Sequence, residues 1–141
     1  MIKMNKQTMV FLILTLVTVT AHSEDSLYQQ LGGKPAIEKI TKHLLDRLLN
    51  NEKINFLFKE TERDDLHIKI VDQICMETGG PCKYEGLDMV EAHSGMNIKY
   101  SEFDIFVEDF ILAMEDAEIP FRLQNKVLAI FAPMREDVSY E

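Results

Sequence analysis

The sequence predicts an all-α domain. Apolar residues recur three and four positions apart in four separate segments, which is the spacing that places them on one face of a helix. No segment alternates apolar and polar residues as a half-buried strand does, and neither a repeat nor a low-complexity tract is present. With 141 residues, the chain has room for one domain.

The N-terminus reads as a signal peptide. Residues 1–8 carry Lys3 and Lys6 and no acid, and Met9–Ala21 is an apolar run diluted only by threonines. Ala21-His22-Ser23 has the small-x-small pattern of a signal-peptidase site. A membrane anchor is the alternative, but the run is shorter than the ~20 residues that span a bilayer. We therefore expect a signal peptide at 1–23, a mature domain at 24–141 and a periplasmic or secreted protein without an integral membrane segment.

The charge balance is acidic. The chain has 15 basic and 24 acidic residues and a net charge of −9. Cleavage after Ser23 removes two lysines and no acid, so the mature charge moves to −11. Such a surface argues against nucleic acid and against anionic membranes as partners.

The two cysteines, Cys75 and Cys82, enclose Gly79, Gly80 and Pro81. An exported chain meets an oxidising compartment, where a pair of this kind forms a disulfide. A metal site would need more ligands, and a redox pair usually has the CxxC spacing. We predict a structural disulfide.

The first half of the chain contains two predicted helices. Ser26–Leu31 forms at most one turn and is followed by Gly32-Gly33, where the backbone can turn sharply. A helix then begins near Pro35 and ends at Asn50-Asn51. Its apolar face is formed by Ile37, Ile40, Leu44, Leu45 and Leu48. After the aromatic connection 54–58, acids at 62, 64 and 65 suit the start of a helix over 61–76.

Two further long helices are predicted in the second half. Ser101 has the character of an N-cap, with Asp104 three residues later. The apolar stripe that follows consists of Phe103, Phe106, Val107, Phe110, Ile111 and Met114. Pro120 opens the last helix, whose inner face is formed by Val127, Leu128, Phe131 and Met134.

Between these halves, the stretch 87–98 holds the residue of greatest chemical interest. Met89 and His93 are four positions apart and share one face of a short helix, which Gly95 can end. A neutral imidazole facing an apolar cavity is what a haem iron needs as its proximal ligand. A hydrogen-bonded core histidine is the ordinary alternative on this stretch alone.

Several short motifs together resemble a group I truncated haemoglobin, the two-over-two helical globin, from the exported bacterial branch with a cysteine pair. They run through almost the whole chain after residue 25, in order and without an evident gap. They are Ser26-Leu27-Tyr28 with Leu31-Gly32-Gly33, then Phe56-Leu57-Phe58, Gly79-Gly80-Pro81 with Tyr84 and Gly86, Ala92-His93 with Gly95-Met96 and Ile98, and Ala132-Pro133-Met134-Arg135 with Asp137-Val138.

The resemblance implies a non-covalent haem b whose iron is held by His93. It places Phe58 against the porphyrin. It places Leu66, Ile70 and Ile74 on the distal side, and Met89, Ile98, Phe103 and Phe106 on the proximal and inner walls. Near the propionates it implies Arg63, His67, Lys83 and Tyr84. No CxxCH motif for thioether attachment is present, and the last helix has no histidine for a vinyl link.

The chain departs from the family on the distal side. Leu45 occupies the position of the tyrosine that usually donates a hydrogen bond to the bound ligand. Leu66 and Ile70 occupy the helix positions that face the iron, where a glutamine usually helps. Losing such a donor weakens oxygen retention by about 1.5–3 kcal/mol and leaves carbon monoxide relatively favoured.

Two polar side chains are candidates for reaching the iron. Lys69 follows Leu66 by three positions, and some relatives use a lysine there as the sixth ligand; His67 is a second candidate. Only a neutral amine binds iron. The alternative for both residues is a solvated or propionate-facing side chain.

The function implied is binding of a diatomic ligand (oxygen, carbon monoxide or nitric oxide) by a monomeric haem protein rather than by a dedicated enzyme. A redox or nitric oxide-detoxifying enzyme with a reductase partner is the first alternative. A haem-free helical interaction module is the second, and it would make His93 an ordinary core residue.

Overall fold

The computed structural model describes residues 25–140. The predicted signal peptide and the expected mature start at Glu24 lie outside these residues. The regular elements are helical throughout the described part, with one isolated bridge between Lys99 and Tyr140, so the all-α prediction is confirmed. In chain order they are α1 (Leu27–Leu31), α2 (Gly33–Asn50), η1 (Asn55–Phe58), α3 (Arg63–Glu77), α4 (Met89–His93), α5 (Tyr100–Asp116), α6 (Phe121–Phe131), η2 (Ala132–Met134) and α7 (Arg135–Val138).

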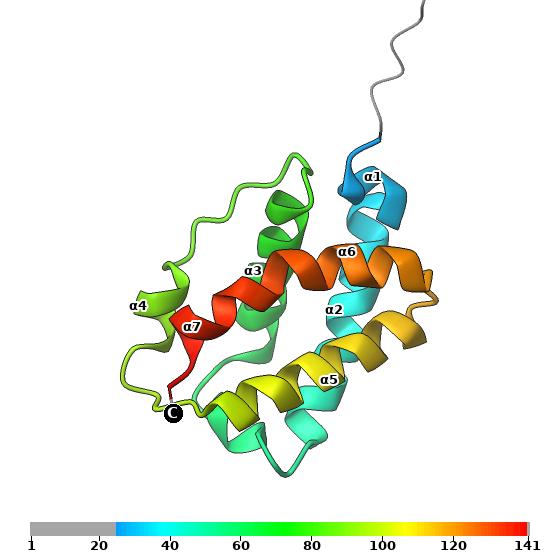
Figure 1. Cartoon of the computed structure of the whole chain (residues 1–141). Coiled ribbons are helices and arrows are strands. Elements are labelled where there is room, and N and C mark those ends of the chain that lie inside the picture. The colour runs from blue at the N-terminus through cyan, green and yellow to red at the C-terminus, as the bar shows by residue number, and fades with distance from the viewer. Residues whose placement is uncertain (1–24, 141) are drawn as a thin grey trace, which may run out of the picture.

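Four helices form the body of the domain. Helix α2 packs against both α3 and α5, and α6 crosses them in the same core (Figure 1). Helix α4 stands apart on the long connection that leaves α3, and it contacts α7 (Figure 1). Within residues 25–140, none of the helices has the length and apolarity needed to cross a bilayer.

The apolar face of α2 supplies the centre of the core. Its residues at helical spacing are fully buried, as the sequence pattern predicts. They are Ile37, Ile40, Leu44, Leu45 and Leu48. Against them pack Phe110 and Met114 of α5, Leu123 and Val127 of α6, and Val71 and Ile74 of α3.

The first turn of the chain is fixed by local hydrogen bonds. The Gln29 N–H donates to Ser26 Oγ (3.3 Å), while the Ser26 N–H donates to Gln29 Oε1 (2.9 Å), which is a capping box. Gly32 then takes a left-handed conformation with φ 107°, which only glycine adopts without strain. Helix α1 therefore ends, and α2 begins, at this residue.

The predicted start of α5 is corrected by the structure. Ser101 is not the N-cap, because the helix begins at Tyr100 and Ser101 lies inside its first turn. The carboxylate of Glu102 instead accepts the Lys99 backbone N–H (2.8 Å). At the C-terminal end, Met134 lies in η2 and not in the last long helix.

Cys75 and Cys82 form the predicted disulfide, which joins the end of α3 to the loop leading to α4. The loop packs closely on α1: a side chain at Gly80 would meet the Tyr28 ring at 2.5 Å and Cys75 Sγ at 2.7 Å. The Tyr28 N–H also donates to the Thr78 carbonyl (2.8 Å). The disulfide and α1 together hold the start of the connection that carries α4.

Replacing both cysteines with alanine is expected to lower the free energy of unfolding by about 2.5 kcal/mol, because the eight-residue loop gains freedom in the unfolded chain. Urea unfolding followed by circular dichroism measures this change. A reductant should lower the stability of the wild type and leave the double variant unchanged. Equal urea midpoints for the two oxidised proteins would contradict the stabilising role.

Candidate functional site

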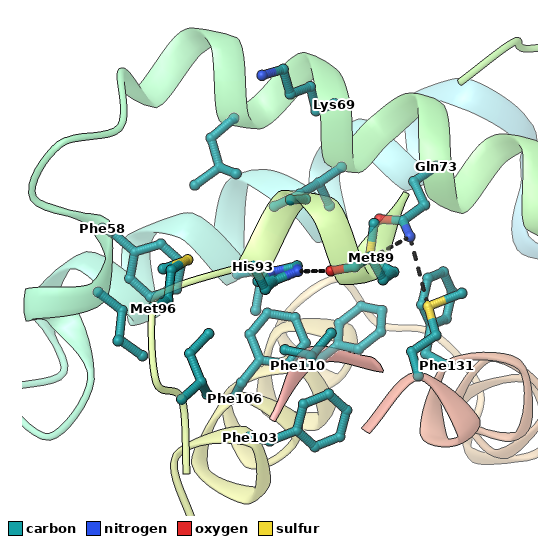
Figure 2. Close-up of a pocket in the computed structure, with 18 of the residues that line it drawn as sticks. Phe58, Lys69, Gln73, Met89, His93, Met96, Phe103, Phe106, Phe110 and Phe131 are labelled. Atoms are coloured by element: carbon teal, nitrogen blue, oxygen red, sulfur yellow. Dashed lines mark hydrogen bonds between the residues drawn. The ribbon is translucent and has the colours of Figure 1, made fainter. Parts of the chain in front are cut away.

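A cavity of about 310 Å³ lies between α3 and α4 and reaches inward to α5 (Figure 2). This volume is at the lower end of the range typical of ligand sites. Its wall is mainly apolar. The lining residues are Leu44, Ile54, Leu57, Phe58, Thr61, Leu66, Lys69, Ile70, Gln73, Ile74, Tyr84, Met89, Ala92, His93, Met96, Ile98, Glu102, Phe103, Phe106, Phe110, Phe131, Met134 and Val138.

The inner wall is a continuous aromatic surface. Phe103, Phe106 and Phe110 follow one another along α5, with ring centroids 6.2 and 6.1 Å apart. Phe131 of α6 meets Phe110 edge-on at 5.9 Å. These spacings are those of favourable aromatic pairs, so the rings stabilise one another as well as making the wall apolar.

His93 lies at the end of α4, in the wall facing α3 (Figure 2). Its Nδ1 is 2.8 Å from the Met89 carbonyl oxygen. A carbonyl oxygen can only accept, so Nδ1 carries the hydrogen and donates it. In the neutral ring, Nε2 then has the free lone pair. Met89 and His93 are four residues apart on one helical face, and this spacing brings the His93 ring to the Met89 carbonyl.

The facing wall comes from α3 and is mainly aliphatic. Leu66 and Ile70 are partly buried there, and Ile74 is buried. Lys69 also borders the cavity but is exposed, and its amino group points away from His93 (Figure 2). In this conformation the Lys69 ammonium group does not face the imidazole.

The structure brings eleven of the twelve predicted cofactor-binding residues to the cavity and leaves one outside. Those that line it are Phe58, Leu66, Lys69, Ile70, Ile74, Tyr84, Met89, His93, Ile98, Phe103 and Phe106. His67 does not. It borders an open surface hollow with Glu38, Lys39, Lys42, Arg63 and Asp64. One residue along a helix is a turn of 100°, so His67 leaves the stripe of Leu66 and Ile70.

Of the other residues expected near the propionates, only Tyr84 borders the cavity. Its hydroxyl donates to the Leu87 carbonyl (2.9 Å), and burial, with a smaller effect from Asp88, raises its pKa. Arg63 instead bonds to Asp46, and this hydrogen bond holds the pKa of the Asp46 carboxyl below its ordinary value. Lys83 is exposed and is not among the lining residues.

Two features of the wall were missed from sequence. The leucine that α2 contributes to the cavity is Leu44, while Leu45 is buried in the core beside it. Gln73 of α3 also lines the cavity and brings a side-chain amide into it. Continuing the stripe of Leu66 and Ile70 by one more step of three residues would have found it.

These observations define a small helical domain built around a mainly apolar cavity, with His93 as the single histidine in its wall among residues 25–140. Comparison with known proteins identifies the class. The sequence model of the bacterial-like globin family matches residues 26–140.

Two of the curated relatives are group 1 truncated hemoglobins. That of Tetrahymena pyriformis is 27% identical over 113 residues, which cover 80% of this chain and 93% of the relative. That of Mycolicibacterium paratuberculosis is 26% identical over 114 residues, with 81% and 84% covered. The crystal structure of the Tetrahymena pyriformis protein in its Fe(III) form has a TM-score of 0.79 at 26% identity and covers 83% of this chain and all of that one. The chain therefore belongs to the bacterial-like globin family and is a group I truncated globin.

Proposed function

We propose that this protein binds haem non-covalently in the cavity, with His93 as the axial iron ligand, and that the haem binds a small diatomic molecule. The observation that carries the proposal is the bond from His93 Nδ1 to the Met89 carbonyl, which leaves the Nε2 lone pair to a metal. A backbone acceptor at the second ring nitrogen is the usual support of a metal-ligating histidine. Family membership and the aromatic inner wall support the same site.

The residues present fit this group. The porphyrin needs an apolar enclosure, which the α5 phenylalanines and the α3 aliphatic side chains provide. Phe58 and Met96 border the same space (Figure 2). When bound, the haem iron supplies an open coordination position for a diatomic ligand. His93 would hold the iron, and the mainly apolar walls would limit the access of water.

The attachment proposed is non-covalent. Both cysteines are consumed in the disulfide, and no histidine occurs between Phe121 and Val138. One solved relative, a 2/2 hemoglobin from a Synechococcus strain, is described with covalently attached heme; it is 24% identical, with a TM-score of 0.76. No equivalent attachment is proposed here.

The wall of the cavity opposite His93 supports weak retention of oxygen. Leu44, Leu66 and Ile70 carry no hydrogen-bond donor, so nothing from these positions can stabilise a ligand that gains negative charge. Carbon monoxide depends less on such a donor. We therefore favour ligand binding over nitric oxide dioxygenation, which requires retained oxygen and a reductase.

Titration of the haem-free protein with haem tests the proposal. One equivalent should produce a sharp Soret band, and the stability of the protein should rise with the logarithm of the free haem concentration once this exceeds the Kd. A broad, non-saturating absorption like that of haem on an unrelated protein would reject it.

We further propose export to the periplasm or the medium as a monomer. The disulfide supports this location, because such bonds persist in oxidising compartments.

Lys69 is proposed as the sixth iron ligand in the ferric protein. Its stem borders the cavity, so rotation of the side chain would turn the amine inward from its present outward direction. Since only the neutral amine binds, the ferric spectrum should become low-spin as the pH rises. The Lys69→Ala variant should lack this transition. Identical ferric spectra of variant and wild type across pH would exclude Lys69.

A further inference from the structure

Helix α4, which carries His93, has little packing of its own. It is five residues long, and none of them is buried. Its N-terminus is capped by Asp88, whose carboxylate accepts the Glu91 N–H (2.8 Å), and its packing neighbour is α7. A short helix is marginal without tertiary contacts, so the few contacts that α4 makes decide where the imidazole lies.

One of these contacts comes from the opposite wall. The Gln73 side chain reaches from α3 to α4, and its Nε2 lies 3.4 Å from Met89 Sδ (Figure 2). The same nitrogen lies 3.7 Å from Met134 Sδ, which belongs to η2. A thioether sulfur has no hydrogen to give, so it is the amide nitrogen that faces the two sulfurs and donates to them.

Met89 connects this contact to His93. Its sulfur accepts from Gln73, while its backbone oxygen accepts from the His93 ring. Met134 belongs with Met89 to a second apolar cluster, around Ile98, Phe103 and Val138. Gln73 therefore joins three segments at the inner end of the cavity: α3, α4 and η2.

The chemistry of this contact is unusual for a core. Gln73 is partly buried in a mainly apolar wall, and its donors meet weak acceptors instead of carbonyl oxygens. A leucine at this position would fill the space without burying a polar group. What the amide adds over a leucine is direction, because its nitrogen lies within hydrogen-bond distance of one sulfur on each of two neighbouring segments.

We propose that Gln73 is a positioning residue: by donating to Met89 and Met134 it fixes α4 against α3 and so sets the orientation of the His93 ring. The consequence for iron coordination rests on the proposed function. The contact between Gln73 and Met89 exists in the protein independently of haem and can be tested separately.

The first experiment is a double-mutant cycle with Gln73→Leu and Met89→Leu in the haem-loaded protein. Each single variant is expected to raise the rate of haem loss about two- to fivefold, the effect of losing one modest hydrogen bond. The double variant should lose haem no faster than the quicker single variant, because the contact that Met89→Leu removes is one that Gln73→Leu already removes. In the ferrous protein, the iron–histidine stretching band measured by resonance Raman should shift in Gln73→Leu.

The matched control is Asn125→Leu, which replaces an exposed amide on α6 with the same side chain. It should retain the wild-type stretching band and rate of haem loss. If Gln73→Leu matches this control in both measurements, or if the effects of the two single variants multiply in the double variant, the proposal is overturned.

The second experiment uses haem-free protein and the nitrogen NMR shifts of the His93 ring. The wild type should show the tautomer protonated at Nδ1, and Gln73→Leu should show shifts averaged between the two tautomers. Unchanged ring shifts in Gln73→Leu would contradict the positioning role. If the wild type takes up no haem, the proposed function fails and this measurement alone decides the role of Gln73.

Discussion

The His93→Gly variant is expected to lose its haem. His93 is the one imidazole in the cavity wall of the described chain, and its Nε2 has a lone pair available to an iron. Loss of a supporting partner of a ligand typically lowers metal affinity about 10–100-fold, so loss of the ligand itself should exceed about 100-fold. Transfer of haem to an excess of a haem-free acceptor protein measures the change.

The matched control for this variant is His67→Gly. His67 borders the outer hollow and not the cavity, so this variant should keep its Soret band. Added imidazole should restore a five-coordinate ferrous spectrum to His93→Gly, because the free base can occupy the space that the side chain leaves. Normal haem retention by His93→Gly in the absence of imidazole would show that another group holds the iron.

The Leu66→Gln variant is expected to hold oxygen about ten- to a hundredfold more tightly than the wild type. Leu66 lines the cavity on α3, where the wild-type wall has only aliphatic groups at positions 66 and 70. A new amide donor to a partly charged ligand is worth about 1.5–3 kcal/mol. Most of the gain in oxygen affinity should appear as a slower oxygen dissociation rate, which stopped-flow measures. The dissociation rate of carbon monoxide should change much less.

Ile68→Gln provides the control on the same helix. Ile68 is 58% exposed and is not among the residues that line the cavity, so an amide there should leave both dissociation rates unchanged. Equal gains in oxygen and carbon monoxide affinity in Leu66→Gln would contradict the donor explanation. Such a result would indicate a change in pocket shape instead.

Much of the fold could be predicted because its signals are local. The face of α2 was read from the spacing of its leucines and isoleucines, and these residues are buried as expected. The turn at Gly32 follows from the backbone freedom of glycine. The start of α5 was misplaced because Ser101 is a good cap by type, whereas Glu102 closes the first turn from inside the helix.

The site could be predicted only in part. His93 and the apolar stripe of α3 were found because motif and periodicity agree there. His67 is predicted near the propionates and as a second candidate iron ligand, whereas the structure places it at an outer surface hollow and not among the residues that line the cavity. Gln73 lies at the next position of the α3 stripe, but an apolar pattern passes over it because its side chain is polar. Its contacts with Met89 and Met134, 16 and 61 residues away, leave no local signal in the sequence.

The central claim is that His93 holds a haem iron in this cavity and leaves the opposite side open to a diatomic ligand. The absorption spectrum of the purified, haem-loaded protein in the ferrous state, before and after addition of carbon monoxide, tests it most directly. We predict a histidine-ligated ferrous spectrum that carbon monoxide converts completely to a single sharp Soret band. A preparation that binds no haem, or a ferrous spectrum that carbon monoxide does not change, would contradict the claim.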